Sequence, residues 1–140
     1  MPDVSFEIKG LKELNRELKK LPEDFRTKAL NTAVRNMANV IKDQAVENAP
    51  KASGFLASSI KTKIAPKKSR FSKYISRYIV RPSKNAYYAH MIEDGTVKQP
   101  AQPYMRPAFM SKKEEAVRKF REVLDRRIFL ANRKIKSLNK

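Results

Sequence analysis

Residues 23–48 read EDFRTKALNTAVRNMANVIKDQAVEN, the longest uninterrupted helical pattern in the chain. Apolar side chains recur three or four positions apart, as they do on one face of an amphipathic helix; they are Phe25, Ala29, Ala33, Met37, Ile41 and Ala45. Pro22 and Pro50 bound the pattern, because proline interrupts a helix and restricts the residue before it. We predict a helix over residues 23–48 whose alanines allow another element to approach closely.

Shorter patterns flank this helix. Residues 4–8 alternate as a short strand does, and leucines at helical spacing predict a first helix over residues 11–21. After the helix, alternation at residues 58–65 and the aromatic, β-branched run at residues 73–81 predict an antiparallel hairpin. Two later helical patterns are expected, a turn or two within residues 86–94 and a final amphipathic helix over residues 108–131.

These elements predict an α+β fold. Both long helices carry one apolar stripe, and the small antiparallel sheet needs a cover, so we expect the long helix and the C-terminal helix to pack on the sheet. With 140 residues, no internal repeat and no composition shift, the chain is expected to form one domain over residues 1–140. A basic loop at residues 65–73 and a basic tail at residues 132–140 would extend from it.

The formal net charge of +18 is the strongest compositional signal and implies an acidic partner, either nucleic acid or protein. From residue 61 to residue 84 the chain carries nine basic residues and no acid. We predict contacts with a polyanion or an acidic partner at Lys67, Lys68, Arg70, Lys73 and Arg77. Aromatic rings among these cations would suit single-stranded nucleic acid, but a strand with a core-packed aromatic face explains them without it and is the favoured interpretation. A small basic nucleic-acid-binding protein is therefore the alternative function.

Other residues argue against catalysis. Cysteine is absent, which excludes disulfides, thiolate zinc sites and cysteine nucleophiles. His90 is the single histidine, and the adjacent Glu93 and Asp94 cannot aim two carboxylates at one bond, so they are interpreted as offsets to local positive charge. The three glycines lie too far apart for a phosphate-binding loop. We expect no catalytic, cofactor or metal site.

No apolar run approaches the ~20 residues of a membrane span, and no secretory signal pattern opens the sequence, so no membrane partner is expected.

The passage from residue 95 to residue 107 has two interpretations. Gly95 suits a turn, and prolines at positions 100, 103 and 107 stiffen the chain before any partner binds. It would form an assembly surface anchored by Tyr104 and Arg106, side chains that often dominate interfaces. In the alternative, it is a stiff crossover in which Tyr104 packs under the last helix.

Several pieces, in this order, resemble the siphophage tail-component family, whose members are also described as tail-completion, head-tail joining or minor tail proteins. The pieces are GLKEL at residues 10–14, AP at 49–50, SGFLxxSI at 53–60, AYYAH at 86–90, ExGT at 93–96 and PAQPYMRPA at 100–108. Asp94 stands where family members usually carry an aromatic residue.

The resemblance implies a non-enzymatic virion subunit of the tail or neck, assembled in the host cytoplasm. It would form a ring with copies of itself, between the head connector or adaptor and the tail terminator or tail-tube proteins. Its basic surface would face DNA passing through the channel or acidic neighbouring rings. The expected assembly residues are Tyr87, Tyr88, Gly95, Thr96, Pro103, Tyr104, Arg106 and Pro107.

Overall fold

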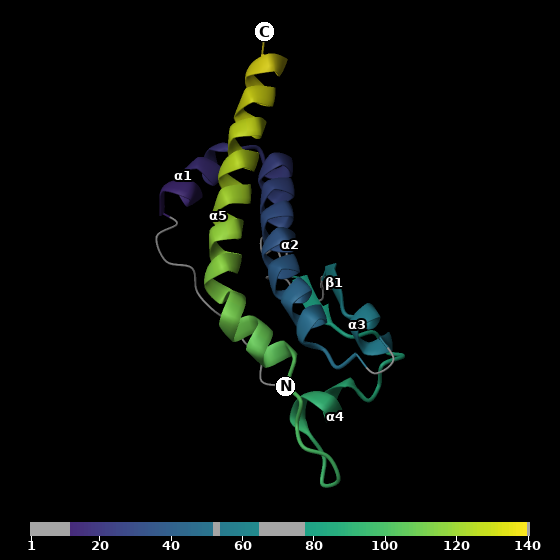
Figure 1. Ribbon diagram of the computed structural model, residues 1–140. Helices are drawn as coiled ribbons and strands as arrows, with labels where there is room; N and C mark the ends of the chain where they lie inside the picture. Colours follow the sequence, from purple (N-terminus) through teal and green to yellow (C-terminus); the bar gives the residue numbers. More distant parts are fainter. Residues whose placement is uncertain (1–11, 52–53, 65–77, 140) are drawn as a thin grey trace.

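The computed structural model describes residues 12–51, 54–64 and 78–139. The elements in chain order are α1 (Lys12–Lys20), α2 (Glu23–Asn48), α3 (Phe55–Ser59), β1 (Lys61–Ile64), β2 (Tyr78–Arg81), α4 (Ala89–Asp94) and α5 (Met105–Leu138). The long helices α2 and α5 lie side by side over most of their length (Figure 1). The α+β fold class is thereby confirmed, with two long helices and a two-stranded antiparallel sheet.

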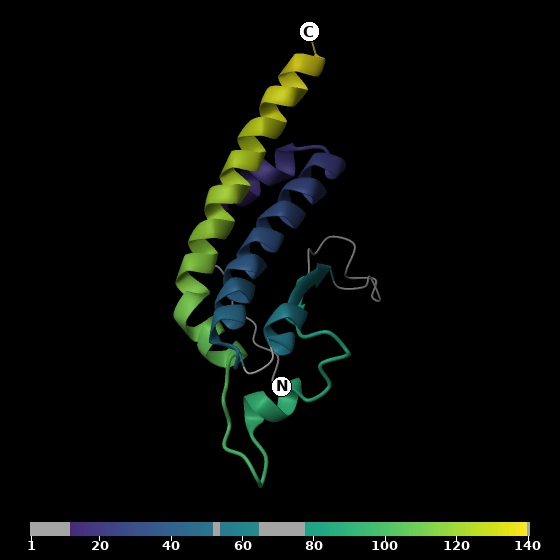
Figure 2. The same cartoon turned by 45° about the vertical axis from the view of Figure 1, so that its right-hand side comes forward.

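Helix α2 lies between α5 and the hairpin, as the turned view in Figure 2 shows. It contacts both strands on one side and packs along α5 on the other. The strands pair antiparallel, with Lys61 opposite Arg81 and Ile64 opposite Tyr78. The predicted hairpin is confirmed where it is described; residues 73–77 of its second strand, and the predicted strand at residues 4–8, lie outside the described residues.

Among the described residues, two apolar clusters form the core. The upper cluster joins α1, α2 and α5 around Leu18, Ala33, Phe120 and Leu124. The lower cluster joins the end of α2 to α3, α4 and the start of α5, around side chains that include Leu56 and Tyr104. Buried alanines on both long helices leave room for the close approach that the sequence predicts; they are Ala29, Ala33, Ala45, Ala108, Ala116 and Ala131.

Local chemistry sets the bounds of the elements. The guanidinium of Arg26 donates to the carbonyls of Leu18 (3.2 Å) and Leu21 (3.1 Å), which satisfies acceptors at the end of α1. A short helix, α3, precedes β1, so the predicted strand over residues 58–65 begins too early. Gly54 adopts φ +71°, a left-handed conformation that opens this helix and that glycine adopts without strain.

Candidate functional site

The side chain of Glu93 binds the N-terminus of α5. Its carboxylate accepts hydrogen bonds from the backbone N–H groups of Tyr104 (2.7 Å), Met105 (3.0 Å) and Arg106 (3.0 Å). Glu93 is buried although it lies at the end of α4, eleven residues before Tyr104. A carboxylate at this position also interacts favourably with the positive end of the α5 dipole.

Pro107 completes the same helix start. The first four N–H groups of a helix have no partner within the helix. Glu93 binds those of residues 104, 105 and 106, and residue 107 is a proline without an N–H group. Every donor at the beginning of α5 is therefore accounted for, although no Ser, Thr, Asp or Asn precedes the helix at the capping position.

The chain between α4 and α5 forms a closed loop over residues 95–103. Gly95 has φ +79°, and a Cβ atom at this position would lie 2.7 Å from the backbone nitrogen of Ala101. The N–H of Gln102 donates to the carbonyl of Ile92 (2.8 Å), so the two ends of the loop are joined. Only glycine permits both this backbone conformation and this close approach.

Thr96 organises the tip of the loop. Its N–H donates to the carbonyl of Gln99 (2.9 Å), and its hydroxyl accepts from the N–H groups of Lys98 (3.3 Å) and Gln99 (3.1 Å). Val97 is completely exposed at this tip. In Figure 1 the loop projects below α4 as the lowest part of the molecule. The loop therefore presents an apolar side chain on a backbone held by its own hydrogen bonds.

Tyr104 belongs to the interior of the protein. Its side chain is 0% exposed, and its hydroxyl lies 3.5 Å from the carbonyl oxygen of Ala89. The amide of Asn48 donates to the Tyr104 carbonyl (3.4 Å), which ties the end of α2 to the start of α5. Burial, with the nearby charges of Glu93 and Asp94, raises the pKa of Tyr104 from 10 to about 12.

The burial of Tyr104 corrects its interpretation as an exposed anchor. Its side chain has no exposed surface, and the alternative, in which Tyr104 packs under the last helix, describes its position. Arg106 remains on the surface, where its guanidinium lies 3.9 Å from the Asp94 carboxylate. Both of those side chains are more than half exposed, so the pair contributes at most about 1 kcal/mol.

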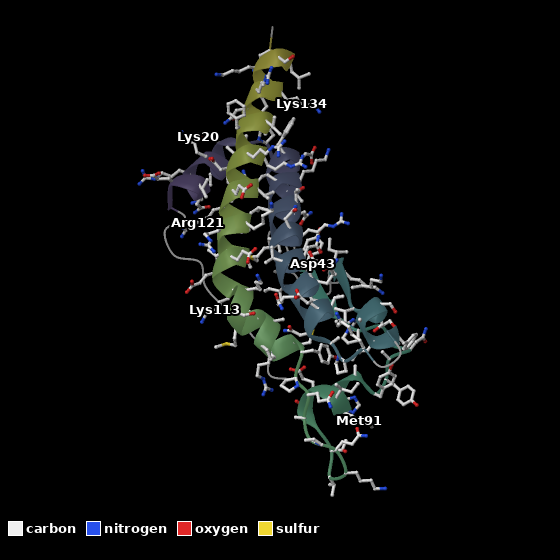
Figure 3. The ribbon with its side chains drawn as sticks, in the orientation of Figure 1. Lys20, Asp43, Met91, Lys113, Arg121 and Lys134 are labelled. Atoms are coloured by element: carbon white, nitrogen blue, oxygen red, sulfur yellow. The ribbon has the colours of Figure 1, made fainter. Side chains whose placement is uncertain are left out.

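Three aromatic side chains, at the start of α3 and just before α4, lie close to one another. The Tyr87 and Tyr88 rings lie edge to face with centroids 5.7 Å apart, and the Phe55 ring lies 6.5 Å from that of Tyr88. Tyr87 is 76% exposed, and Met91, one turn along, is also exposed at this end of the molecule (Figure 3). Exposed apolar patches often mark interaction sites, and aromatic residues are more frequent in protein interfaces than on the rest of the surface.

The structure gathers the expected assembly residues at one end of the molecule. Thr96, Pro103, Arg106 and Pro107 are exposed on or beside the loop, and Gly95 forms its hinge. Their role in assembly stays a prediction. The expected polyanion contacts Lys67, Lys68, Arg70, Lys73 and Arg77 lie outside the described residues.

The hairpin that leads into this basic segment carries like charges on opposite strands. Lys61 pairs with Arg81, and both side chains are exposed, as is that of Lys63. Like charges directly opposite in a sheet destabilise it. Within the described residues no acid pairs with any of these three cations.

The sequence interpretation missed the role of Glu93. It assigned the carboxylate to local charge balance, whereas the structure gives it the helix start. The available signal was the absence of a capping side chain before α5, which implies an acceptor from elsewhere in the chain.

Within residues 12–51, 54–64 and 78–139 no three acidic or histidine side chains cluster as a metal site would require. Among the same residues, no helix has the length and apolar character to cross a membrane.

Comparison with known proteins places these features in a family. Residues 12–95 match the family model described as "Bacteriophage HK97-gp10, putative tail-component". The matched span runs from α1 through α4 and includes both Glu93 and Gly95, whereas α5 lies beyond it. No curated protein and no solved structure matches the chain. Because the match covers more than half of the sequence, the chain belongs to the HK97-gp10-like family of bacteriophage tail components.

Proposed function

We propose that the chain is a tail-completion or neck subunit that forms a ring between the head connector and the tail, with no catalytic role. Family membership supports a structural protein of the phage tail that interacts with other virion proteins. The finer role is proposed from the loop at residues 95–103. It is closed by its own hydrogen bonds and exposes Val97, so little conformational freedom is lost when it docks.

The aromatic group supports the same surface. Tyr87 is 76% exposed and Phe55 is 43% exposed. Rigid aromatic side chains contribute much of the binding energy in protein interfaces, because they bury a large area at a small entropic cost. The loop and these rings together would form the contact between neighbouring subunits of the ring.

The experiment that tests this proposal replaces Val97 by Asp and Tyr87 by Ser in one variant. We expect the melting temperature to stay near that of the unchanged chain, because both side chains are exposed. We expect ring formation, measured by native mass spectrometry, to fall, together with the number of complete tails when the variant complements a phage that lacks this gene. Lys113→Glu is the matched control, because Lys113 lies on the lower half of α5 away from the loop (Figure 3). Rings and tails formed at normal levels by the double variant would contradict the proposal.

The alternative, a nucleic-acid-binding role, is supported by one observation, the unpaired cations of the hairpin. Lys61, Lys63 and Arg81 would contact phosphate in DNA that passes the ring. Salt-dependent binding to plain duplex DNA, lost when these residues are reversed in charge, would favour this role.

A further inference from the structure

Helix α5 extends beyond the rest of the subunit. It has 34 residues against 26 in α2. At about 1.5 Å per residue it is about 12 Å longer. In Figures 1 and 2 its C-terminal turns rise above the corner between α1 and α2, at the end of the molecule opposite the loop. Ile128, Ala131 and Ile135 of this segment pack into the upper cluster, so the subunit uses this one face of the helix.

The opposite face carries exposed apolar side chains. Phe129 is 65% exposed and Leu130 is 41% exposed. Arg126 and Arg133 lie one turn away on either side, and Lys136 follows one turn later. Residues three or four apart share a face of a helix, and we name this group of five, Arg126, Phe129, Leu130, Arg133 and Lys136, the tip face.

Charge separates along α5 at the same place. The acids Glu114, Glu115, Glu122 and Asp125 all precede Arg126, and from residue 126 to residue 139 there are five cations and no acid. Within the described residues none of the three tip-face cations has an ion pair. Attraction to the helix dipole favours cations within the last turn only, which here contains Lys136. The dipole therefore leaves Arg126 and Arg133 unexplained.

We infer that the tip face is a docking site for an acidic protein surface that also offers apolar side chains. Phosphate groups of DNA would pair with the arginines but would leave Phe129 and Leu130 in water. A second tip face would oppose cations to cations, which excludes symmetric pairing of this face. Two adjacent apolar residues bury too little area to hold the helix on a membrane. Phenylalanine and arginine together are typical of protein interfaces.

This inference goes beyond the proposed ring. The loop and the aromatic group lie at the other end of the molecule, and a chain that forms no ring would still bind through the tip face. The two proposals therefore fail independently.

The test uses the full chain and a labelled amphipathic helical peptide of glutamate and leucine, titrated by fluorescence anisotropy. Phe129→Ser with Leu130→Ser, and separately Arg126→Glu with Arg133→Glu, should each weaken binding about tenfold, the equivalent of ~1.4 kcal/mol. Lys113→Glu with Arg118→Glu is the matched control, since it makes the same charge change on exposed positions of α5 before the tip face, and it should change binding less than about twofold. A peptide of glutamate alone should bind more weakly than the peptide that contains leucine.

Three results would overturn the inference. The first is equal loss of peptide binding in the control variant, which would mean that net charge alone attracts the peptide. The second is a loss of duplex DNA binding in the variant with Phe129→Ser and Leu130→Ser that is as large as its loss of peptide binding, which would mean that the tip face does not distinguish DNA from an acidic protein. The third is a change in the sedimentation of the chain alone in that variant, which would mean that another copy covers the tip face.

Discussion

Glu93 connects two helices through a single buried carboxylate. A carboxylate that accepts three backbone N–H groups replaces the capping side chain that a helix start ordinarily supplies locally. Since the acceptor comes from the end of α4, the position of α5 depends on the closed loop between them. Gly95 and Glu93 thus both fix the geometry of the loop, Gly95 by allowing its close approach to Ala101 and Glu93 by binding the start of α5.

Replacing Glu93 by Gln should destabilise the subunit by about 2 kcal/mol, because an amide has one acceptor oxygen and directs its N–H₂ group at N–H donors. The measurement is urea-induced unfolding followed by circular dichroism. Glu114→Gln, an exposed change on α5, is the matched control and should shift stability by less than about 0.5 kcal/mol. Equal urea midpoints for the two variants would show that the buried carboxylate of Glu93 contributes no more to the free energy of unfolding than an exposed one does.

Tyr104 makes the stability of the folded chain depend on pH in the alkaline range. Its pKa is raised from 10 to about 12 in the folded chain, so between these values the folded state holds a proton that the unfolded state has lost. Stability from this residue is fully present below pH 10 and is lost as pH rises to 12. Compared with Tyr104→Phe, the unchanged chain should lose about 3 kcal/mol over this range, measured by urea unfolding at several pH values. Parallel curves for the two chains would contradict the raised pKa.

At the scale of elements, the sequence predicts the long helix best. The expected range of residues 23–48 coincides with α2, because Pro22 and the Ala49–Pro50 pair stop the helix on both sides. The first helix and the hairpin were also predictable, since short-range apolar spacing decides them. Patterns of this kind report which face of an element is buried.

The last helix shows what such patterns omit. It spans Met105–Leu138 where residues 108–131 were expected, so most of the predicted basic tail is helical. Pro107 looked like the start of the helix, but its missing donor is harmless anywhere in the first turn. The helix begins three residues before Ala108 because Glu93, at the end of α4, accepts hydrogen bonds from the N–H groups of Tyr104, Met105 and Arg106. Beyond Ala131, lysines and arginines obscured the stripe that continues through Ile135.

The hairpin carries a prediction in which stability and binding change in opposite directions. Lys61→Glu would place an acid opposite Arg81, which should stabilise the folded chain by about 0.5–1 kcal/mol. The same change removes a cation from the surface proposed to contact DNA, so duplex binding at low salt should weaken. Thermal unfolding and gel shift on one sample measure both effects. Lys113→Glu controls for net charge, and weaker stability with unchanged DNA binding would contradict this account.

The whole molecule is an elongated pair of helices with different chemistry at its two ends. The loop end presents aromatic side chains and Val97, and the α5 end presents cations around Phe129 and Leu130. Across this length the chain carries a net charge of +18, which opposes contact between copies. The proposed ring contacts and the proposed contacts with acidic partners should therefore respond to salt in opposite ways.

We expect self-association to strengthen when salt rises from 50 to 500 mM, because the Debye length falls from about 14 to 4 Å and repulsion between copies is screened. Binding of the acidic peptide or of DNA should weaken over the same range. Sedimentation velocity measures the first and anisotropy the second. If added salt dissociates the copies, their contacts are formed between opposite charges, contrary to the loop-centred ring.

The closed base of the loop has a consequence for changes in chain length. Because Gln102 binds Ile92 and Glu93 binds the start of α5, both ends of the loop are held whatever lies between them. Doubling the length of a flexible loop adds only about 0.6 kcal/mol of closure entropy. An insertion between Lys98 and Gln99 would disturb the turn at Thr96 and leave α2 and α5 in register. The loop tip could therefore vary in length and sequence among related phages, or carry an epitope tag, while the helical body stays the same.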